Sequence, residues 1–275
     1  MNKIIEINTL DAPELAPYAR LTEAQLKSRQ RPEDGIFIAE GVKVCEYALR
    51  AGYEPLSFLM ERKHIKGKAA ALLELCSNIT VYTAESSTLS ALTGFELTRG
   101  VLCAMRRKAL PTVEEVCAGA RRIAVLEGLV DASNVGAIFR SASALGVDGI
   151  LLSPNCCDPL YRKAIRAGMG SVFTLPWCFL PEYMCSFDEG VPGILRNLGF
   201  ESAALALDER AKELDAPELK SIDRLAIFMG NEGDGLKKET IAQCDHTVII
   251  PMRHGMDSLN VAAAAAIAFW ELRAK

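Results

Sequence analysis

Residues 121–140 read RRIAVLEGLVDASNVGAIFR and contain one strand followed by one helix. The unbroken apolar run predicts a strand over 123–130. The helical spacing of the apolar residues after it predicts a helix over 134–145, capped by Ser133 or Asn134. A strand that is apolar on both faces must be covered on both faces, which is typical of a parallel sheet between layers of helices.

The same alternation of apolar strands and helices continues to the end of the sequence. It predicts strands over 149–153, 172–176, 202–207, 225–229 and 247–251. Helices are predicted over 161–168, 188–198, 235–243 and 258–272. We therefore expect an α/β domain over 121–275 with a parallel sheet, of the kind that binds ligands beyond the carboxyl ends of its strands.

The first 108 residues predict a smaller α/β domain of their own. Short apolar runs predict strands over 36–39, 56–60, 80–83 and 101–105. Helices are predicted over 42–51, 67–77 and 86–93, and a basic loop over 27–35. The composition changes abruptly after Arg106-Arg107-Lys108, so 109–120 is the expected linker, with a surface loop inside one domain as the alternative.

Composition restricts the class of protein. The chain has 275 residues, half of them apolar and about a quarter charged, as is usual for a globular protein. Its longest apolar run, 261–270, is far shorter than the roughly 20 residues that a membrane span needs. The amino-terminal segment has acidic residues and no apolar signal core, so we expect a cytoplasmic protein without a membrane partner.

The nine cysteines are an odd number and include no Cys-x-x-Cys pair. We therefore expect reduced, mostly buried thiols and no metal site. The net charge of −4 does not by itself favour a nucleic-acid partner. However, residues 1–108 carry 15 Lys and Arg against 13 Asp and Glu, whereas the remainder carries 16 against 22. A nucleic-acid surface is therefore expected on the first domain.

Two further segments follow predicted strands. The first, Gly230-Asn231-Glu232-Gly233-Asp234-Gly235-Leu236, has three glycines that let the backbone face a ligand. It matches neither the dinucleotide fingerprint nor a phosphate loop, and its acidic side chains favour a neutral or cationic ligand, such as a sulfonium. The second, 249–261, contains Asp257 and Ser258, either of which can cap the last helix. It also contains His254, which could act as a base because of its residue type, although a histidine in a loop usually has no catalytic role.

Taken together, these segments resemble the SpoU/TrmH-type RNA 2′-O-ribose methyltransferases of the SPOUT superfamily. The matching motifs are Asn-x-Gly-Ala-x-x-Arg at 134–140, Gly-Asn-Glu-Gly-x-Gly-Leu at 230–236, and Ile-Pro-Met with Ser-Leu-Asn-Val at 250–261. Phe37-Ile38-Ala39-Glu40-Gly41-x-Lys43 resembles the substrate-binding domain that many relatives carry, which is similar to ribosomal proteins that bind structured RNA.

The resemblance implies a trefoil knot in 121–275, S-adenosylmethionine as the methyl donor, RNA as the substrate and a homodimer with the active site near the subunit interface. It also implies a set of site residues. The residues implied to bind the cofactor are Leu207, Gly230, Ile250 and Leu259. Those implied to form the reaction site are Asn134, Arg140, Glu232, Ser258 and Asn260.

The resemblance gives Arg140 the leading part in the reaction, either as the base or as an electrostatic stabiliser. Because the pKa of arginine lies above about 12, a neutral guanidine is costly and the electrostatic role is favoured. Asn134 and Ser258 would orient the arginine or the ribose hydroxyl, and Glu232 would hold the arginine or its loop.

Two alternatives belong to other classes. A nucleotide-dependent oxidoreductase shares the α/β alternation, but no G-x-G-x-x-G follows the first strand of the second domain. A non-catalytic RNA-binding protein would keep the fold and lose the chemistry, yet all the reaction-site residues are present. Among RNA substrates, the two-domain organisation favours ribosomal RNA over transfer RNA.

Overall fold

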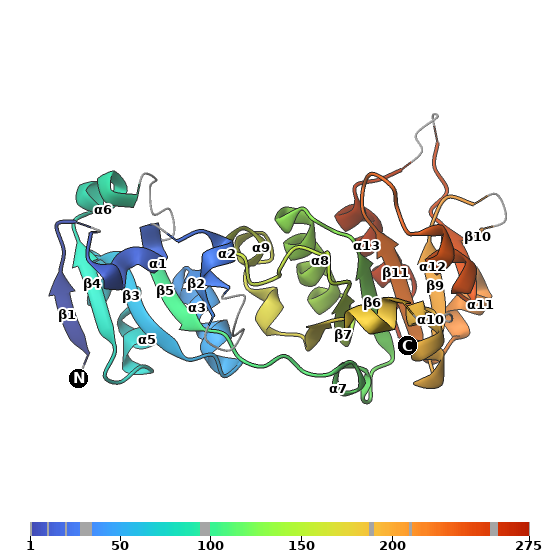
Figure 1. Cartoon of the computed structure of the whole chain (residues 1–275), viewed down its shortest axis with the longest axis horizontal. Helices are drawn as coiled ribbons and strands as arrows, with labels where there is room; N and C mark the ends of the chain where they lie inside the picture. The colour runs from blue at the N-terminus through green and yellow to red at the C-terminus, as the bar shows by residue number, and fades with distance from the viewer. Residues whose placement is uncertain are drawn as a thin grey trace. The chain divides into compact units, whose positions relative to one another are not determined.

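The computed structural model describes residues 2–274 except 10, 20, 28–34, 94–99, 187–189, 209–210 and 254–257. The chain forms two compact units (Figure 1). The first unit consists of Met1–Ala109 with Leu160–Phe173, and the second of Leu110–Pro159 with Thr174–Lys275. Most of the basic loop expected over 27–35, as well as His254 and Asp257, lies outside the described residues.

The second unit is built on a parallel sheet. Its strands are β6 (Arg122–Glu127), β7 (Gly149–Leu152), β8 (Trp177–Phe179), β9 (Glu201–Leu205), β10 (Lys212–Glu213), β11 (Leu225–Gly230) and β12 (His246–Ile249). They lie in the order β10-β12-β9-β11-β6-β7-β8, and neighbouring strands in this order are parallel. The predicted parallel α/β sheet is therefore confirmed.

Helices cover both faces of this sheet. Helices α7 (Val113–Cys117), α10 (Gly190–Asn197) and α12 (Lys238–Gln243) enclose an apolar core with alternate strand residues such as Val125 and Phe228. The strand residues between these, such as Leu126 and Ile227, are equally buried, so the other face is covered too. Helices α8 (Ala132–Ala144) and α13 (Val261–Glu271) pack against each other, and α13 contacts β11.

The remaining elements of the second unit are short: η4 (Glu182–Ser186) and α11 (Pro217–Ser221). Within the part of the chain that the structure describes, no helix is long and apolar enough to cross a bilayer.

The first unit has a mixed sheet. Its strands are β1 (Lys3–Glu6), β2 (Ile36–Glu40), β3 (Pro55–Glu61), β4 (Thr80–Ala84) and β5 (Val101–Arg106), in the order β1-β4-β3-β5-β2. Strands β1, β4 and β3 are parallel, and β5 is antiparallel to both β3 and β2. Its helices are η1 (Pro13–Leu15), α1 (Ala16–Ala19), α2 (Glu23–Leu26), α3 (Val42–Arg50), α4 (Arg62–Ile65), α5 (Ala70–Glu74) and α6 (Ser86–Thr93).

Residues 160–173 belong to the first unit, although the sequence places them inside the domain over 121–275. They form α9 (Arg162–Ala167) and η3 (Ser171–Phe173). Helix α9 contacts β2, and the ring of Phe173 lies 5.6 Å from that of Phe37 and 5.3 Å from that of Tyr53.

The predicted strand over 172–176 is wrong. Gly170, with φ +83°, turns the chain into η3, and the strand begins only at Trp177, directly after Pro176. A proline has no N–H to donate to a sheet, so β8 starts beyond it.

The expected linker over 109–120 contains an ordered helix. Thr112 and Glu115 form a capping box at the start of α7, in which the backbone N–H of each donates to the side chain of the other, at 2.8 and 3.2 Å. Val113 and Val116 are buried in the core of the second unit. The apolar spacing that suggested a new alternation after the proline therefore marks the beginning of that unit.

A buried arginine ties three distant segments of the second unit together. Arg122, at the start of β6, is 2% exposed. Its guanidinium donates to the backbone carbonyls of Arg121, Ile222 and Asp223, at 2.7 to 2.9 Å, and to that of Leu272 at the end of α13. Through these bonds, Arg122 fixes the last helix against the first strand of the unit.

We expect Arg122→Met to lower the free energy of unfolding by roughly 3 kcal/mol or more, because several carbonyls lose their partner in the interior. Arg121→Met is the matched control. Arg121 is exposed and pairs with Asp223 at 3.0 Å, so its loss should cost less than about 1 kcal/mol. Urea denaturation followed by circular dichroism measures both, and equal losses would contradict this account of Arg122.

Candidate functional site

A cavity of about 330 Å³ lies at the carboxyl ends of β9, β11 and β12. Its walls are formed by 205–207 after β9, the loop 230–236 after β11, 248–250 at the end of β12, and Ser258, Leu259 and Val261 at the start of α13. The cavity therefore occupies the edge of a parallel sheet at which ligands are usually bound.

The loop 230–236 is held by its own hydrogen bonds. The side-chain oxygen of Asn231 accepts the N–H groups of Gly233 and Asp234, each at 2.8 Å. The carbonyl of Asn231 accepts the N–H of Gly235 at 3.1 Å, and Gly235 has φ +71°. The loop is thus a turn closed by its own hydrogen bonds.

Gly230 is required by close backbone packing. A Cβ at this position would lie 2.0 Å from the carbonyl carbon of Gly235 and 2.2 Å from the nitrogen of Leu236. The two ends of the loop therefore touch at Gly230, and any side chain there would force them apart.

Three predicted reaction-site residues form one hydrogen-bonded chain. The amide nitrogen of Asn260 donates to the amide oxygen of Asn134 at 3.0 Å, and the amide nitrogen of Asn134 donates to the carboxylate of Glu232. The amide oxygen of Asn260 accepts the N–H of Ala262 at 3.0 Å. The chain joins α13, α8 and the loop 230–236 beside the cavity, and it will be called the Asn260–Asn134–Glu232 chain.

Both helix caps differ from the sequence expectation. Asp131, not Ser133 or Asn134, caps α8, accepting the N–H groups of those two residues at 2.7 and 3.0 Å. Asn260, not Ser258, caps α13, which begins at Val261 and not at 258. Because Asp131 takes the capping role, the side chain of Asn134 is available to bond Glu232 and Asn260.

The predicted site residues fall into three groups. Those that line the cavity are Leu207, Gly230, Glu232, Ile250, Ser258 and Leu259. Asn134 and Asn260 contact Glu232 and each other through the chain. Arg140 alone lies elsewhere.

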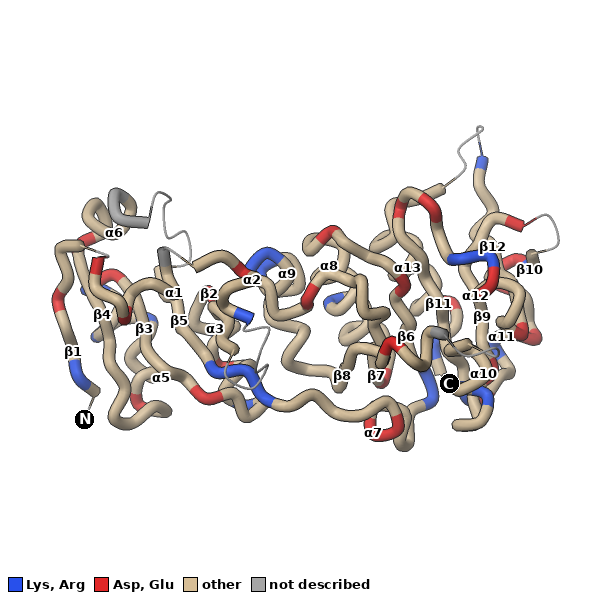
Figure 2. Tube along the Cα trace, in the orientation of Figure 1, with Lys and Arg blue, Asp and Glu red and all other residues tan. Residues whose placement is uncertain are grey.

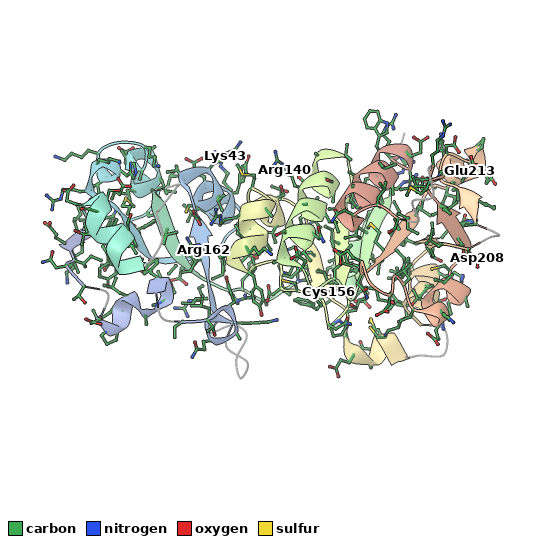
Figure 3. The ribbon with its side chains drawn as sticks, turned by 90° about the horizontal axis from the view of Figure 1, so that it is seen from above. Lys43, Arg140, Cys156, Arg162, Asp208 and Glu213 are labelled. Atoms are coloured by element: carbon green, nitrogen blue, oxygen red, sulfur yellow. The ribbon has the colours of Figure 1, made fainter. Side chains whose placement is uncertain are left out.

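Arg140, labelled in Figure 3, is on the exposed face of α8 and does not line the cavity. It makes no hydrogen bond or ion pair with the described residues. Arg140 follows Asn134 by six residues, which on a helix is about 9 Å along the axis and about 120° around it. Within one chain, the structure therefore does not bring Arg140 to the other reaction-site residues.

Glu127 does not line the cavity, but it supports the segment that follows the loop 230–236, and the sequence analysis missed it. Its carboxylate, at the end of β6, accepts the backbone N–H of Lys237 at 2.8 Å and the hydroxyl of Thr240 at 2.7 Å. It thereby holds the beginning of α12, which has no capping side chain of its own. A carboxylate that interrupts the apolar run 123–130 was the signal for it in the sequence.

The electrostatics of the cavity favour a neutral or cationic ligand. Glu232 and Asp234 line the cavity, whereas its described lining contains no Lys or Arg. In the described part of the chain, no group of His, Cys, Asp and Glu side chains is arranged to hold a metal ion.

Three thiols of the second unit are poor nucleophiles. Burial raises the pKa of Cys117 to about 11 and those of Cys178 and Cys244 to about 12. All nine cysteines are free thiols. Because only a thiolate is strongly nucleophilic, these three groups are unreactive near neutral pH.

Comparison with known proteins identifies relatives over the whole chain. A family model described as the SpoU rRNA Methylase family matches residues 121–270. An uncharacterized tRNA/rRNA methyltransferase of Mycobacterium tuberculosis is 36% identical over 267 residues, which is 95% of this chain and 88% of the relative. The 23S rRNA (guanosine(2553)-2′-O)-methyltransferase RlmP of Bacillus subtilis is 28% identical over 89% of this chain and 91% of its own length.

Solved structures share the fold. The AdoMet-bound rRNA methyltransferase from Sinorhizobium meliloti superposes with a TM-score of 0.80, at 24% identity, over 98% of this chain and 97% of that one. The SpoU methyltransferase AviRb from Streptomyces viridochromogenes, in complex with AdoMet, gives a TM-score of 0.73 at 24% identity, over 91% and 94% of the two chains.

We expect Gly230→Ala to lower the free energy of unfolding by about 2 kcal/mol or more, because the new Cβ cannot fit against the backbone of Gly235. Gly233→Ala is the control in the same loop. A Cβ at Gly233 would meet only the side-chain oxygen of Asn231, at 3.3 Å, so the change should cost less than about 1 kcal/mol. Equilibrium denaturation compares the two, and a Gly230→Ala protein as stable as the Gly233→Ala protein would refute the close packing.

Proposed function

Because the chain belongs to the SpoU rRNA methylase family, we propose that it transfers a methyl group from S-adenosylmethionine to a ribose 2′-hydroxyl of ribosomal RNA. Family membership confirms the resemblance seen in the three sequence segments, and it removes the oxidoreductase alternative. The observation that carries the proposal is the Asn260–Asn134–Glu232 chain, which gathers predicted reaction-site residues from three segments beside one cavity.

The cavity fits S-adenosylmethionine chemically. Leu207, Ile250 and Leu259 supply apolar walls, and the glycines of the loop 230–236 expose backbone groups for hydrogen bonding. Glu232 and Asp234 suit the positive charge of a sulfonium. The cofactor supplies an electrophilic methyl group, and a relative with the same fold is known in its AdoMet-bound form.

In the proposed reaction, the methyl group would pass to the ribose oxygen, S-adenosylhomocysteine would leave with the electron pair of the broken carbon–sulfur bond, and the 2′-hydroxyl proton would pass to solvent water. We propose that Arg140 stabilises the negative charge that develops on the ribose oxygen, since a guanidinium presents several N–H donors to an oxyanion. Ser258, exposed at the cavity, would orient the hydroxyl, and the Asn260–Asn134–Glu232 chain would hold the loop 230–236 in place.

The position of Arg140 favours a homodimer in which each Arg140 serves the cavity of the partner. One apolar stripe of α13, formed by Ala263, Ile267 and Trp270, is solvent-exposed, and the two larger residues are 41% and 55% exposed. Residues at this spacing share one helix face. Such a face on a helix that is apolar all around is expected to be covered by another surface.

The first unit is proposed to hold the RNA, and the second unit, from 110 to 159 and 174 to 275, to carry the knotted methyltransferase site. Ribosomal RNA is favoured over transfer RNA because the curated relative RlmP is named as a 23S rRNA methyltransferase. A protein with this substrate would act in the cytoplasm.

Arg140→Ala should lower the turnover number by about a hundredfold or more, because one charge-stabilising donor is lost from the transition state. Binding of S-adenosylhomocysteine, measured by calorimetry, should stay nearly unchanged. Turnover is measured as the transfer of labelled methyl groups to ribosomal and transfer RNA from cells that lack this gene. Labelled transfer RNA with unlabelled ribosomal RNA would reverse the substrate assignment, and RNA binding without any methyl transfer by the natural chain would favour a non-catalytic protein.

Mixed dimers test whether Arg140 acts across the subunit interface. Arg140→Ala and Glu232→Ala proteins should each be inactive alone, but when they are dissociated and reassociated together, one site per mixed dimer has both residues intact. We therefore expect turnover to return in purified mixed dimers that carry two different affinity tags. If purified mixed dimers stay inactive while natural-chain dimers recover fully from the same treatment, Arg140 does not act in the partner's site.

A further inference from the structure

The charge of the protein is divided between its two units more sharply than along its sequence. Residues 160–173 contain Arg162, Lys163 and Arg166 and no acidic residue. With this segment, the first unit carries 18 Lys and Arg against 13 Asp and Glu, a surplus of +5. The second unit carries 13 against 22, a balance of −9. Fourteen residues therefore supply more than half of the positive surplus of the first unit.

A buried carboxylate orders two of these three cations. Glu40, at the end of β2, is 2% exposed. Arg162, labelled in Figure 3, donates to it through Nε at 3.0 Å and lies 2.9 Å from it through Nη2. Arg166 approaches the same carboxylate through Nε at 3.7 Å. A second carboxylate, that of Glu23, accepts the backbone N–H of Arg162 at 2.8 Å. Two carboxylates thus lie beside the three cations of α9, which leaves one positive charge in excess.

Arg166 presents its charge outward. Its side chain is 49% exposed, and its only recorded partner among the described residues, Glu40, lies on the Nε side. The two terminal nitrogens, which form the bidentate face of a guanidinium, are therefore open to an oxyanion. Lys163 is also exposed, and Figure 2 shows positive and no negative residues on α9.

Two other basic runs of the first unit, 62–68 and 106–108, are partly compensated, and in the second of them Arg106 pairs with Glu54 at 3.0 Å. Arg62 pairs with Glu6 and Glu85, and Lys63 pairs with Glu61. These carboxylates offset part of the charge of both runs. On α9, by contrast, an exposed guanidinium, that of Arg166, is positioned by a buried carboxylate, and this makes the surface of α9 a candidate for binding a polyanion.

We propose that Lys163 and Arg166 of α9 bind phosphate groups of the RNA substrate, with Glu40 and Arg162 holding the helix in position. The identification of the polyanion as RNA rests on the proposed function, whereas the phosphate-binding surface rests on the charges and contacts of α9. Arginine suits this task because its planar fork matches two phosphate oxygens. Holding the helix in advance lowers the entropy lost on binding.

The test compares Lys163→Gln/Arg166→Gln with the natural chain, using a fluorescein-labelled RNA hairpin and fluorescence anisotropy over a series of KCl concentrations. At about 0.1 M KCl we expect the dissociation constant to rise about tenfold or more. The slope of log K against log[KCl] should also fall by roughly 2, about one for each lost phosphate contact. Lys163→Arg/Arg166→Lys keeps both charges and should retain most of the affinity and the slope.

The matched control is Lys3→Gln/Arg50→Gln, which removes one exposed Lys and one exposed Arg from the same unit. Lys3 lies in β1, at the sheet edge opposite β2. This control should change affinity less than about twofold, and circular dichroism and the denaturation midpoint verify that all variants fold. Unchanged affinity and slope in the α9 variant, or an equal loss in the control, would overturn the proposal.

Methyl transfer and S-adenosylhomocysteine binding, measured on the same proteins, separate this proposal from the proposed function. If the natural chain transfers no methyl group but binds RNA through α9, the proposed function fails and the phosphate-binding surface stands. If methyl transfer proceeds and the α9 variant binds RNA as the natural chain does, the surface fails and the function stands.

Discussion

The Asn260–Asn134–Glu232 chain is the interaction on which the candidate site depends. It joins residues that are 126 and 98 positions apart in the sequence, so only the completed fold can form it. The amides of Asn134 and Asn260 each use their oxygen and their nitrogen, and rotating either amide by half a turn would place donors against donors or oxygen against oxygen. The chain therefore fixes side-chain orientation as well as distance. It ends on a carboxylate in the loop that lines the cavity.

The parallel sheet makes this convergence possible. Carboxyl ends of β6, β9, β11 and β12 meet at one edge, so the segments that leave them are neighbours whatever their separation in sequence. Gly230 then lets the two ends of its loop touch, and Glu127 holds the start of α12 beside them. At the opposite end of the unit, Arg122 anchors the end of α13, whose first residues line the cavity. The last helix consequently contributes both to the stability of the unit and to the geometry of the site.

Sequence patterns could predict most strands of the second unit and the residues that line the cavity, because both leave local signals, whereas Arg140 lies away from the cavity. Apolar runs mark the strands of the second unit, and motif residues mark the walls of the cavity. Three features left no such signal, and two of them depend on contacts between distant residues. Residues 160–173 join the first unit through Glu40 and Phe37, helix caps are decided by which of several adjacent polar residues is best placed, and β1 is a short edge strand that is ordered by pairing with β4.

The net charge of −4 misleads because it averages two units with opposite requirements. An acidic cavity suits a sulfonium, and a basic surface suits a polyanion, but the two charges would cancel each other's field if they were mixed. The positive segment 160–173 belongs to the first unit, whereas the acidic cavity belongs to the second. Because this segment folds with the first unit, its three cations add to the positive charge of that unit and leave the second unit more acidic. The division of charge follows from the path of the chain and cannot be derived from composition alone.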